Sequence, residues 1–152
     1  MSIVSNSFCL FLLFSLFSFL SIAGKSAPKE VRIPLNLSFE NLDTPKPISL
    51  VPIPDGSNRS LLVLQGGKIL MLSDDYESEK VETFLELSSE DMIDNAFEEG
   101  LLGLVFHPDF LDNHLFYLYH TLQNPKRSVL VERKVRNFDK MIVDPKFVRT
   151  II

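Results

Sequence analysis

The sequence is poor in residues that several protein classes require. Its 152 residues include one cysteine and no tryptophan, and no Lys, Arg, Asp or Glu precedes Lys25. The single cysteine, Cys9, cannot pair within the chain, which excludes a disulfide-stapled scaffold. The formal net charge is -5, with 23% charged and 45% hydrophobic residues. This composition excludes a disordered chain and a polybasic nucleic-acid binder.

The uncharged start contains an apolar segment. Residues 8–23 are hydrophobic apart from three serines, and they end in Ser21-Ile22-Ala23. A membrane-spanning helix needs about 20 apolar residues, whereas small side chains at the last and third-last positions are typical of a signal-peptidase site. We predict a signal peptide, residues 1–23, cleaved after Ala23. The protein would then be secreted or extracellular (periplasmic if bacterial), with no membrane contact after cleavage; an uncleaved membrane anchor is the alternative.

Removal of the first 23 of the 152 residues would leave 129 residues without cysteine. A chain of that size can bury the core of a single domain. Residues 24–47 hold four prolines, which disfavour long helices. We expect a proline-rich segment there that leads into the domain, with an edge strand over residues 31–39.

From Ile48 onward, short apolar runs alternate with turn signals, which is typical of an all-β chain. Gly66-Gly67, between two apolar runs, predicts a hairpin, and no segment shows a sustained helical period. Residues 101–106 are continuously apolar and predict a fully buried strand. On this pattern a sandwich, a barrel and a propeller all remain open. The predicted strands are residues 48–53, 60–64, 69–72, 81–87, 101–106, 115–121, 128–136 and 147–152.

Charge is segregated along the chain. Residues 74–99 hold eleven acidic residues and one lysine, whereas residues 126–149 hold eight basic and three acidic residues. Two solvated loop regions are the simplest interpretation. Complementary packing of the rim of one module against the next is the alternative.

The three histidines, His107, His114 and His120, do not form a metal-site pattern. They are seven and six residues apart across a turn and a predicted strand, a spacing that does not bring three imidazoles to one metal ion. We predict structural roles for them. The sequence also lacks a phosphate-binding loop and a triad-like spacing of Ser, His and Asp.

Two adjacent carboxylates, Glu98 and Glu99, precede the strand that Gly100 and Gly103 flank. Glycine at such positions permits close backbone approach or an unusual turn. A carboxylate at the mouth of a buried strand can face a ligand. Two solvated loop acids are the simpler interpretation.

Two Asn-X-Ser tripeptides begin at Asn36 and Asn58 and fall in or before predicted loops. Such tripeptides are acceptors for N-glycosylation on the surface loops of secreted proteins. Asn36 and Asn58 are therefore candidate glycosylation sites.

Several blocks of the sequence, in order, form a recognisable pattern. They are residues 58–69, residues 84–88, Glu98-Glu99-Gly100-Leu101-Leu102-Gly103-Leu104-Val105-Phe106-His107-Pro108-Asp109-Phe110, Asn113 and residues 116–121. These blocks resemble the glucose/sorbosone dehydrogenase family, and the resemblance runs from about Ile48 to the last residue. It implies a six-bladed β-propeller, in a family whose enzymes hold pyrroloquinoline quinone (PQQ) with calcium and oxidise the anomeric carbon of a sugar, with a histidine as base.

The resemblance covers only the N-terminal part of the family pattern. A propeller blade has about four strands and about 40–45 residues, so residues 48–152 predict an all-β, incomplete β-propeller of about two to three blades. The family's catalytic histidine segment and its calcium- and quinone-holding residues come later in the pattern. We therefore assign no catalytic residue and no metal ligand, and we expect His107 to be a turn residue.

One position carries over from the family. A Gln or Glu stands two residues before the first glycine of the family's Gly-Leu-Leu-Gly block and faces the central site. The matching residue here is Glu98, which the resemblance predicts to face the sugar or the cofactor.

The expected function is that of a fragment of a secreted PQQ-dependent aldose dehydrogenase-like protein, inactive alone, whose full-length relatives act on sugars. The first alternative is a non-enzymatic extracellular propeller-type binding module related to hedgehog-interacting-like proteins. Those relatives are usually rich in cysteine, which the cleaved chain would lack. A second alternative is a relic that self-associates through unpaired edge strands.

Overall fold

The computed structural model describes residues 39, 42–74, 80–88, 92 and 96–152. The chain divides into two units, Met1–Leu35 and Asn36–Ile152, and every described residue belongs to the second. The predicted signal peptide, its cleavage site after Ala23, the glycosylation candidate Asn36 and all but the last residue of the predicted strand 31–39 lie outside the described residues.

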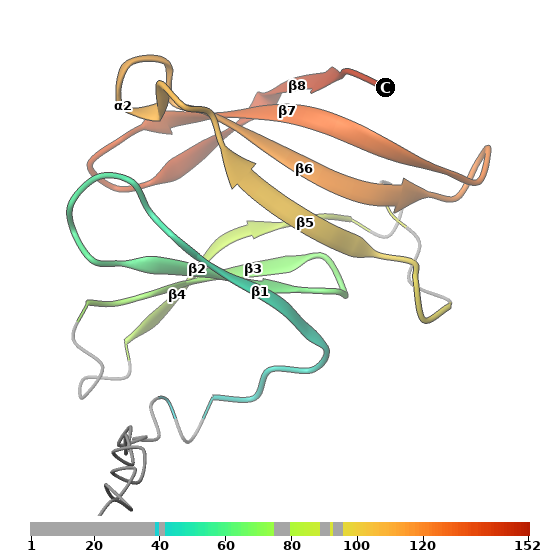
Figure 1. Ribbon diagram of the computed structural model, residues 1–152, viewed down its shortest axis with the longest axis horizontal. Helices are drawn as coiled ribbons and strands as arrows, with labels where there is room; N and C mark the ends of the chain where they lie inside the picture. Colours follow the sequence, from blue (N-terminus) through green and yellow to red (C-terminus); the bar gives the residue numbers. More distant parts are fainter. Residues whose placement is uncertain (1–38, 40–41, 75–79, 89–91, 93–95) are drawn as a thin grey trace, which may run out of the picture. The chain divides into compact units, whose positions relative to one another are not determined.

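In the described part of the chain, eight strands form two four-stranded antiparallel sheets (Figure 1). Strands that are consecutive in sequence are neighbours in each sheet, so the all-β prediction is confirmed. One single-turn helix, α2 (Phe110–Asn113), joins β5 to β6. The first sheet contains β1 (Pro47–Pro52), β2 (Ser60–Leu64), β3 (Lys68–Leu72) and β4 (Val81–Glu86). The second contains β5 (Leu101–Phe106), β6 (Leu115–Leu122), β7 (Arg127–Asn137) and β8 (Ile142–Thr150).

The continuous apolar runs of β2 and β3 arise because the first sheet is covered on both faces. Successive side chains of a strand point to opposite faces, and a strand buried on both faces is apolar throughout. One face carries Leu61, Val63, Ile69 and Met71. The other carries Leu62, Leu64, Leu70 and Leu72, packed with Phe39, Leu42 and Val81.

The two sheets pack face to face through a shared apolar core. Leu61 and Val63 of the first sheet belong to the same buried cluster as Leu101 and Leu118 of the second. β1 and β2 contact β5, and β4 contacts β8. Equivalent strands of the two sheets therefore lie next to each other, which is the arrangement of adjacent propeller blades.

The prediction of a fully buried strand over residues 101–106 is wrong. β5 forms over those residues, but Leu101 is its one fully buried residue, and Val105 is 57% exposed. β5 is the edge strand of its sheet. Leu104 and Phe106 pack toward the shared core, so Val105, which alternates with them, points to the opposite face.

The last strand begins earlier than its predicted range of residues 147–152. β8 covers Ile142–Thr150 and leaves Ile151 and Ile152 beyond its end. Pro145 obscured the start, because proline has no N–H to donate to a sheet. β8 is an edge strand, where proline is tolerated, and its pairing with β7 is interrupted by register shifts.

Candidate functional site

The carboxylates and glycines that the sequence singles out lie where three connections meet. These are the turn between β2 and β3, the connection that enters β5, and the hairpin between β6 and β7. All three lie at the same end of the two sheets.

Gln65, in the turn after β2, holds the connection that enters β5. Its side-chain Nε2 donates hydrogen bonds to the carbonyl oxygens of Phe97 and Glu99, each at 2.7 Å. Its own carbonyl accepts a 2.8 Å hydrogen bond from the amide of Leu101. Gln65 is 6% exposed, so one buried residue fixes the backbone on both sides of Glu98.

Gly100 must be glycine because Gln65 passes very close to it. A Cβ at Gly100 would lie 2.3 Å from the carbonyl oxygen of Gln65, and the φ angle is +116°. The Gly100 amide donates a 2.8 Å hydrogen bond to Oγ1 of Thr121, and its carbonyl accepts one from the Thr121 amide at 3.1 Å. The predicted close approach is therefore confirmed at Gly100. At Gly103 the nearest atom would be 3.9 Å away, at Tyr119.

The two adjacent carboxylates have different environments. Glu98 is exposed, whereas the side chain of Glu99 is only 8% exposed and forms an ion pair with Lys126 of the β6–β7 hairpin. The interpretation of both residues as solvated loop acids fails for Glu99. The ion pair joins one residue of the acidic region of the sequence to one residue of the basic region.

A hollow of about 570 Å³ opens beside Glu98. The ring of Phe97, next to Glu98, is 94% exposed. An aromatic ring, carboxylates, hydroxyls and two basic side chains thus converge on a small volume, as in small-molecule sites. The lining residues are Ala96, Phe97, Glu98, Glu99, Thr121, Lys126, Arg127 and Ser128. Sequence reasoning missed Phe97 and Lys126, because neither belongs to a motif.

The three histidines occupy separate structural positions. His107 Nδ1 accepts a 3.0 Å hydrogen bond from the Asp109 amide and lies 2.8 Å from the side-chain nitrogen of Asn113. The ring of His114 stacks on Phe138 at a centroid distance of 4.9 Å, and His120 is buried in β6. Among the described residues, no group of three His, Cys, Asp or Glu side chains is placed to hold a metal ion.

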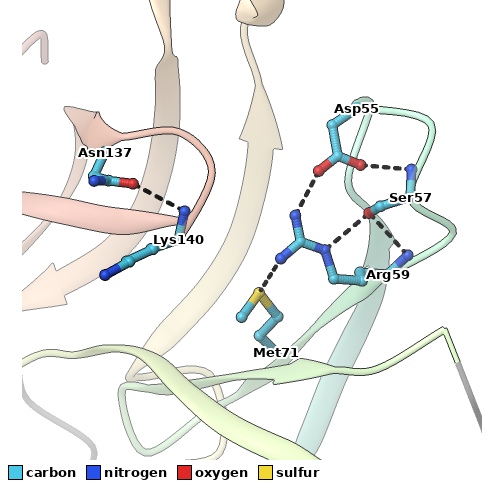
Figure 2. Close-up of polar contacts among 6 residues, drawn as sticks. All are labelled: Asp55, Ser57, Arg59, Met71, Asn137 and Lys140. Atoms are coloured by element: carbon cyan, nitrogen blue, oxygen red, sulfur yellow. Dashed lines mark hydrogen bonds and ion pairs between the residues drawn. The ribbon is translucent and has the colours of Figure 1, made fainter.

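At the opposite end of β2, Arg59 organises the turn between β1 and β2 (Figure 2). Its Nη2 pairs with Oδ2 of Asp55 at 2.7 Å, and its Nε donates a 2.9 Å hydrogen bond to Oγ of Ser57. Nη1 lies 3.6 Å from the sulfur of Met71. Arg59 also lines a cavity of about 1140 Å³ between the sheets. Because its donors point into the turn, we interpret Arg59 as structural.

We expect Asp55→Asn to remove an acid-sensitive part of the stability. Burial raises the pKa of Asp55, but hydrogen bonds from Ser57 and Arg59 and the charge of Arg59 outweigh it, so the pKa falls below its ordinary value of 3.8. A carboxyl whose pKa is lowered by folding stabilises the fold above the unfolded pKa, and this stabilisation is lost as the pH falls through the folded pKa.

For Asp55→Asn, the free energy of unfolding should fall by about 1–2 kcal/mol at pH 7, and its difference from the wild type should shrink as the pH falls below about 3.8. Urea unfolding at a series of pH values measures both quantities. Asp74→Asn, at an exposed position, is the control and should change stability by less than about 0.5 kcal/mol. A loss from Asp55→Asn that does not change with pH would contradict the role given to its charge.

Comparison with known sequences gives one family, and two plant proteins are among the similar sequences. Residues 44–147 match the family model described as Glucose / Sorbosone dehydrogenase. The HIPL2 protein of Arabidopsis thaliana is 30% identical over 95 residues, which is 58% of this chain and 13% of that protein. The HIPL1 protein of the same plant is 30% identical over 91 residues, which is 55% of this chain and 13% of that protein. The chain thus spans a small part of these relatives.

Solved structures share the fold, and three of them have TM-scores of 0.55–0.56. An oxidoreductase (glucose dehydrogenase) from Thermus thermophilus has a TM-score of 0.55 at 24% identity, over 72% of this chain and 28% of that one. The PQQ-bound aldose sugar dehydrogenase of Streptomyces coelicolor gives 0.56 at 19%, over 72% and 30%. The soluble aldose sugar dehydrogenase of Escherichia coli, without cofactor, gives 0.55 at 20%, over 71% and 29%.

These likenesses confirm the predicted incomplete β-propeller, with the two sheets as two blades. The chain spans less than a third of the length of each of these three structures. Within the described residues, no helix has the length and apolar character needed to cross a membrane.

Proposed function

Because the chain belongs to the glucose/sorbosone dehydrogenase family, we propose that it contributes two blades and a sugar-facing carboxylate, Glu98, to a secreted, PQQ-dependent aldose dehydrogenase-like protein. Residues 1–23 would direct the chain to secretion and would be removed on the way. The observation that carries the proposal is the placement of Glu98, which is exposed on a connection that the buried Gln65 holds on both sides.

The support around Glu98 favours ligand binding over a surface role. Gln65 fixes the carbonyl groups of Phe97 and Glu99, the two residues that flank Glu98. A side chain on a backbone that is already ordered loses less conformational entropy when it binds a ligand. Glu98 therefore has the rigid base that a binding carboxylate needs.

The hollow beside Glu98 has the chemistry to hold a sugar ring. A sugar offers hydroxyl groups as hydrogen-bond donors and an apolar ring face. The Glu98 carboxylate can accept hydrogen bonds from the hydroxyls, and the exposed ring of Phe97 supplies an apolar surface with the geometry of an aromatic platform. Ser128 and Arg127 line the same hollow and can donate further hydrogen bonds.

PQQ and calcium are the cofactors that the family implies. The described residues do not form a metal-holding cluster of three His, Cys, Asp or Glu side chains, so this part of the chain does not fit calcium by itself. We propose that oxidation of the sugar requires further parts of the family fold.

The test is a glucose titration of the 152-residue chain followed by NMR. We expect weak saturable binding, with a Kd on the order of 1–10 mM, and shift changes centred on residues 96–99 and 126–128. Glu98→Ala and Phe97→Ala should each weaken binding by about tenfold, the loss of one good contact of about 1.4 kcal/mol. Asp112→Ala, at an exposed position at the opposite end of β6, should leave binding unchanged.

Binding that is absent, or unaffected by Glu98→Ala, would overturn the sugar-facing role of Glu98. A second arm mixes the chain with PQQ, Ca²⁺, glucose and an electron-accepting dye. We expect no dye reduction above background. Reduction by this chain alone would overturn the proposal that further parts of the fold are needed.

A non-enzymatic extracellular binding module is the second candidate function. The observation in its favour is the 30% identity to the HIPL2 and HIPL1 proteins, which exceeds the 19–24% identity to the three solved dehydrogenases. Capture of a specific protein partner by a chain that binds neither PQQ nor sugar would favour this function over the first.

A further inference from the structure

The tripeptide Asn58-Arg59-Ser60 lies at the junction of a turn and a strand. Asn58 is exposed, and its φ of 59° places it in the left-handed region, which asparagine adopts more readily than most residues. The side chain of Arg59 is turned toward Asp55 and Ser57 (Figure 2). The Asn58 side chain therefore lies at the surface. The Arg59 side chain points toward the turn and does not cover it.

Ser60, the third residue of the tripeptide, is largely buried in the folded chain. It is the first residue of β2 and is 8% exposed. It is paired with Pro52 of β1 on one side and with Leu72 of β3 on the other. Its backbone is therefore held between two neighbouring strands, and most of its surface is buried, as soon as the first sheet forms.

N-glycosylation requires Ser or Thr at this third position, so the transferase must read the hydroxyl of Ser60 when it modifies Asn58. We infer that Asn58 is an N-glycosylation site that is modified before β2 pairs with its neighbours, and that the folded chain is not a substrate. The structure thus fixes an order, glycan first and sheet second.

The transfer itself is an ordinary substitution at an activated sugar. A bond forms between the side-chain nitrogen of Asn58 and the anomeric carbon of an oligosaccharide. The bond from that carbon to its lipid pyrophosphate leaving group breaks, and the amide nitrogen loses one proton. The co-reactant is a lipid-pyrophosphate-linked oligosaccharide, and no oxidant or reductant takes part.

The glycan is compatible with the folded chain and with the hollow. Asn58 lies in the β1–β2 turn, whereas Gln65 lies in the β2–β3 turn, so they are at opposite ends of β2. A glycan on the exposed Asn58 leaves the sheet pairing of Ser60 intact. It also stays at the end of the sheet away from Glu98.

The inference rests on the proposed secretion. The first experiment therefore uses a known signal peptide, so that a failure of glycosylation at Asn58 can be distinguished from a failure of residues 1–23 to direct secretion. Residues 1–23 are replaced by a known cleavable signal peptide, and Asn36→Gln leaves one tripeptide. Translation with microsomes should give a product that loses one glycan on treatment with peptide N-glycosidase. Ser60→Ala should abolish the glycan, and Ser60→Thr should keep it. An unglycosylated product, or a glycan that survives Ser60→Ala, would overturn the site.

The second experiment tests the order of events. Purified transferase and its lipid-linked donor are offered the folded Asn36→Gln chain or the same chain just diluted from urea. We expect transfer at least tenfold faster to the unfolded chain. In microsomes, Gly100→Ala, which destabilises the folded state through the clash with Gln65, should be glycosylated at least as fully as its parent. Equal transfer to folded and unfolded chains would overturn the order.

Discussion

Replacing Gly100 by alanine is expected to destabilise the folded chain strongly. The new Cβ would lie 2.3 Å from the Gln65 carbonyl oxygen and 2.9 Å from its Cγ, at a φ of +116°. The nearer atom belongs to backbone that also accepts the Leu101 amide hydrogen bond, so it cannot move aside without breaking that bond. The left-handed conformation alone costs about 1–2 kcal/mol for alanine, and overpacking adds about 1–3 kcal/mol.

A total loss of about 2–5 kcal/mol is a large part of the roughly 5–15 kcal/mol that stabilises a typical domain. Circular dichroism during urea titration measures the loss. Two glycines serve as matched controls. Gly56→Ala has the strain of a φ of +77° with no atom within 4 Å, and Gly103→Ala has its nearest atom at 3.9 Å.

We expect a loss of about 1–2 kcal/mol for Gly56→Ala and a change within about 0.5 kcal/mol for Gly103→Ala. This order separates the clash at Gly100 from backbone strain. Cooperative unfolding of Gly100→Ala within about 1 kcal/mol of the wild type would show that the backbone does not pass as closely as described.

The strands were largely predictable because their signals are local. Apolar runs and the Gly66-Gly67 turn lie within a few residues of each other, and they locate β2 and β3 closely. The start of β8 was missed because Pro145 has opposite meanings in central and edge strands. Which strand is an edge depends on pairing between distant segments, which the local sequence does not contain.

The candidate site was predictable only in part. Glu98 and the glycines were found, but the sequence does not distinguish Gly100 from Gly103, since the difference is the approach of Gln65 from another turn. The buried Glu99 forms its ion pair with Lys126. In the sequence, the segregated charge was the only signal for that pair. Contacts between residues far apart in sequence, such as Gln65 and Glu99, follow from the packing of two sheets.

Replacing Gln65 is the other change with a large expected effect on stability, because its side chain donates two hydrogen bonds that leucine cannot donate. Gln65→Leu keeps the approximate size of the side chain but removes the donor that serves the carbonyl oxygens of Phe97 and Glu99. A buried polar group that loses its partner costs about 1–3 kcal/mol, so we expect a loss of about 2–4 kcal/mol in urea unfolding. Gln123→Leu, at an exposed position in the β6–β7 hairpin, is the control and should change stability by less than about 0.5 kcal/mol.

Gln65→Glu tests the donor directly, because a carboxylate can only accept hydrogen bonds. At pH 7 it would place negative oxygens against the two carbonyl groups, so its loss should exceed that of Gln65→Leu. The deficit should shrink as the pH falls, since a protonated carboxyl can donate one of the two bonds. Both variants should also weaken glucose binding while Glu98 itself is unchanged, because Gln65 orders the backbone on both sides of it. Full stability of Gln65→Leu, or full sugar binding in a folded variant, would show that Glu98 does not depend on this support.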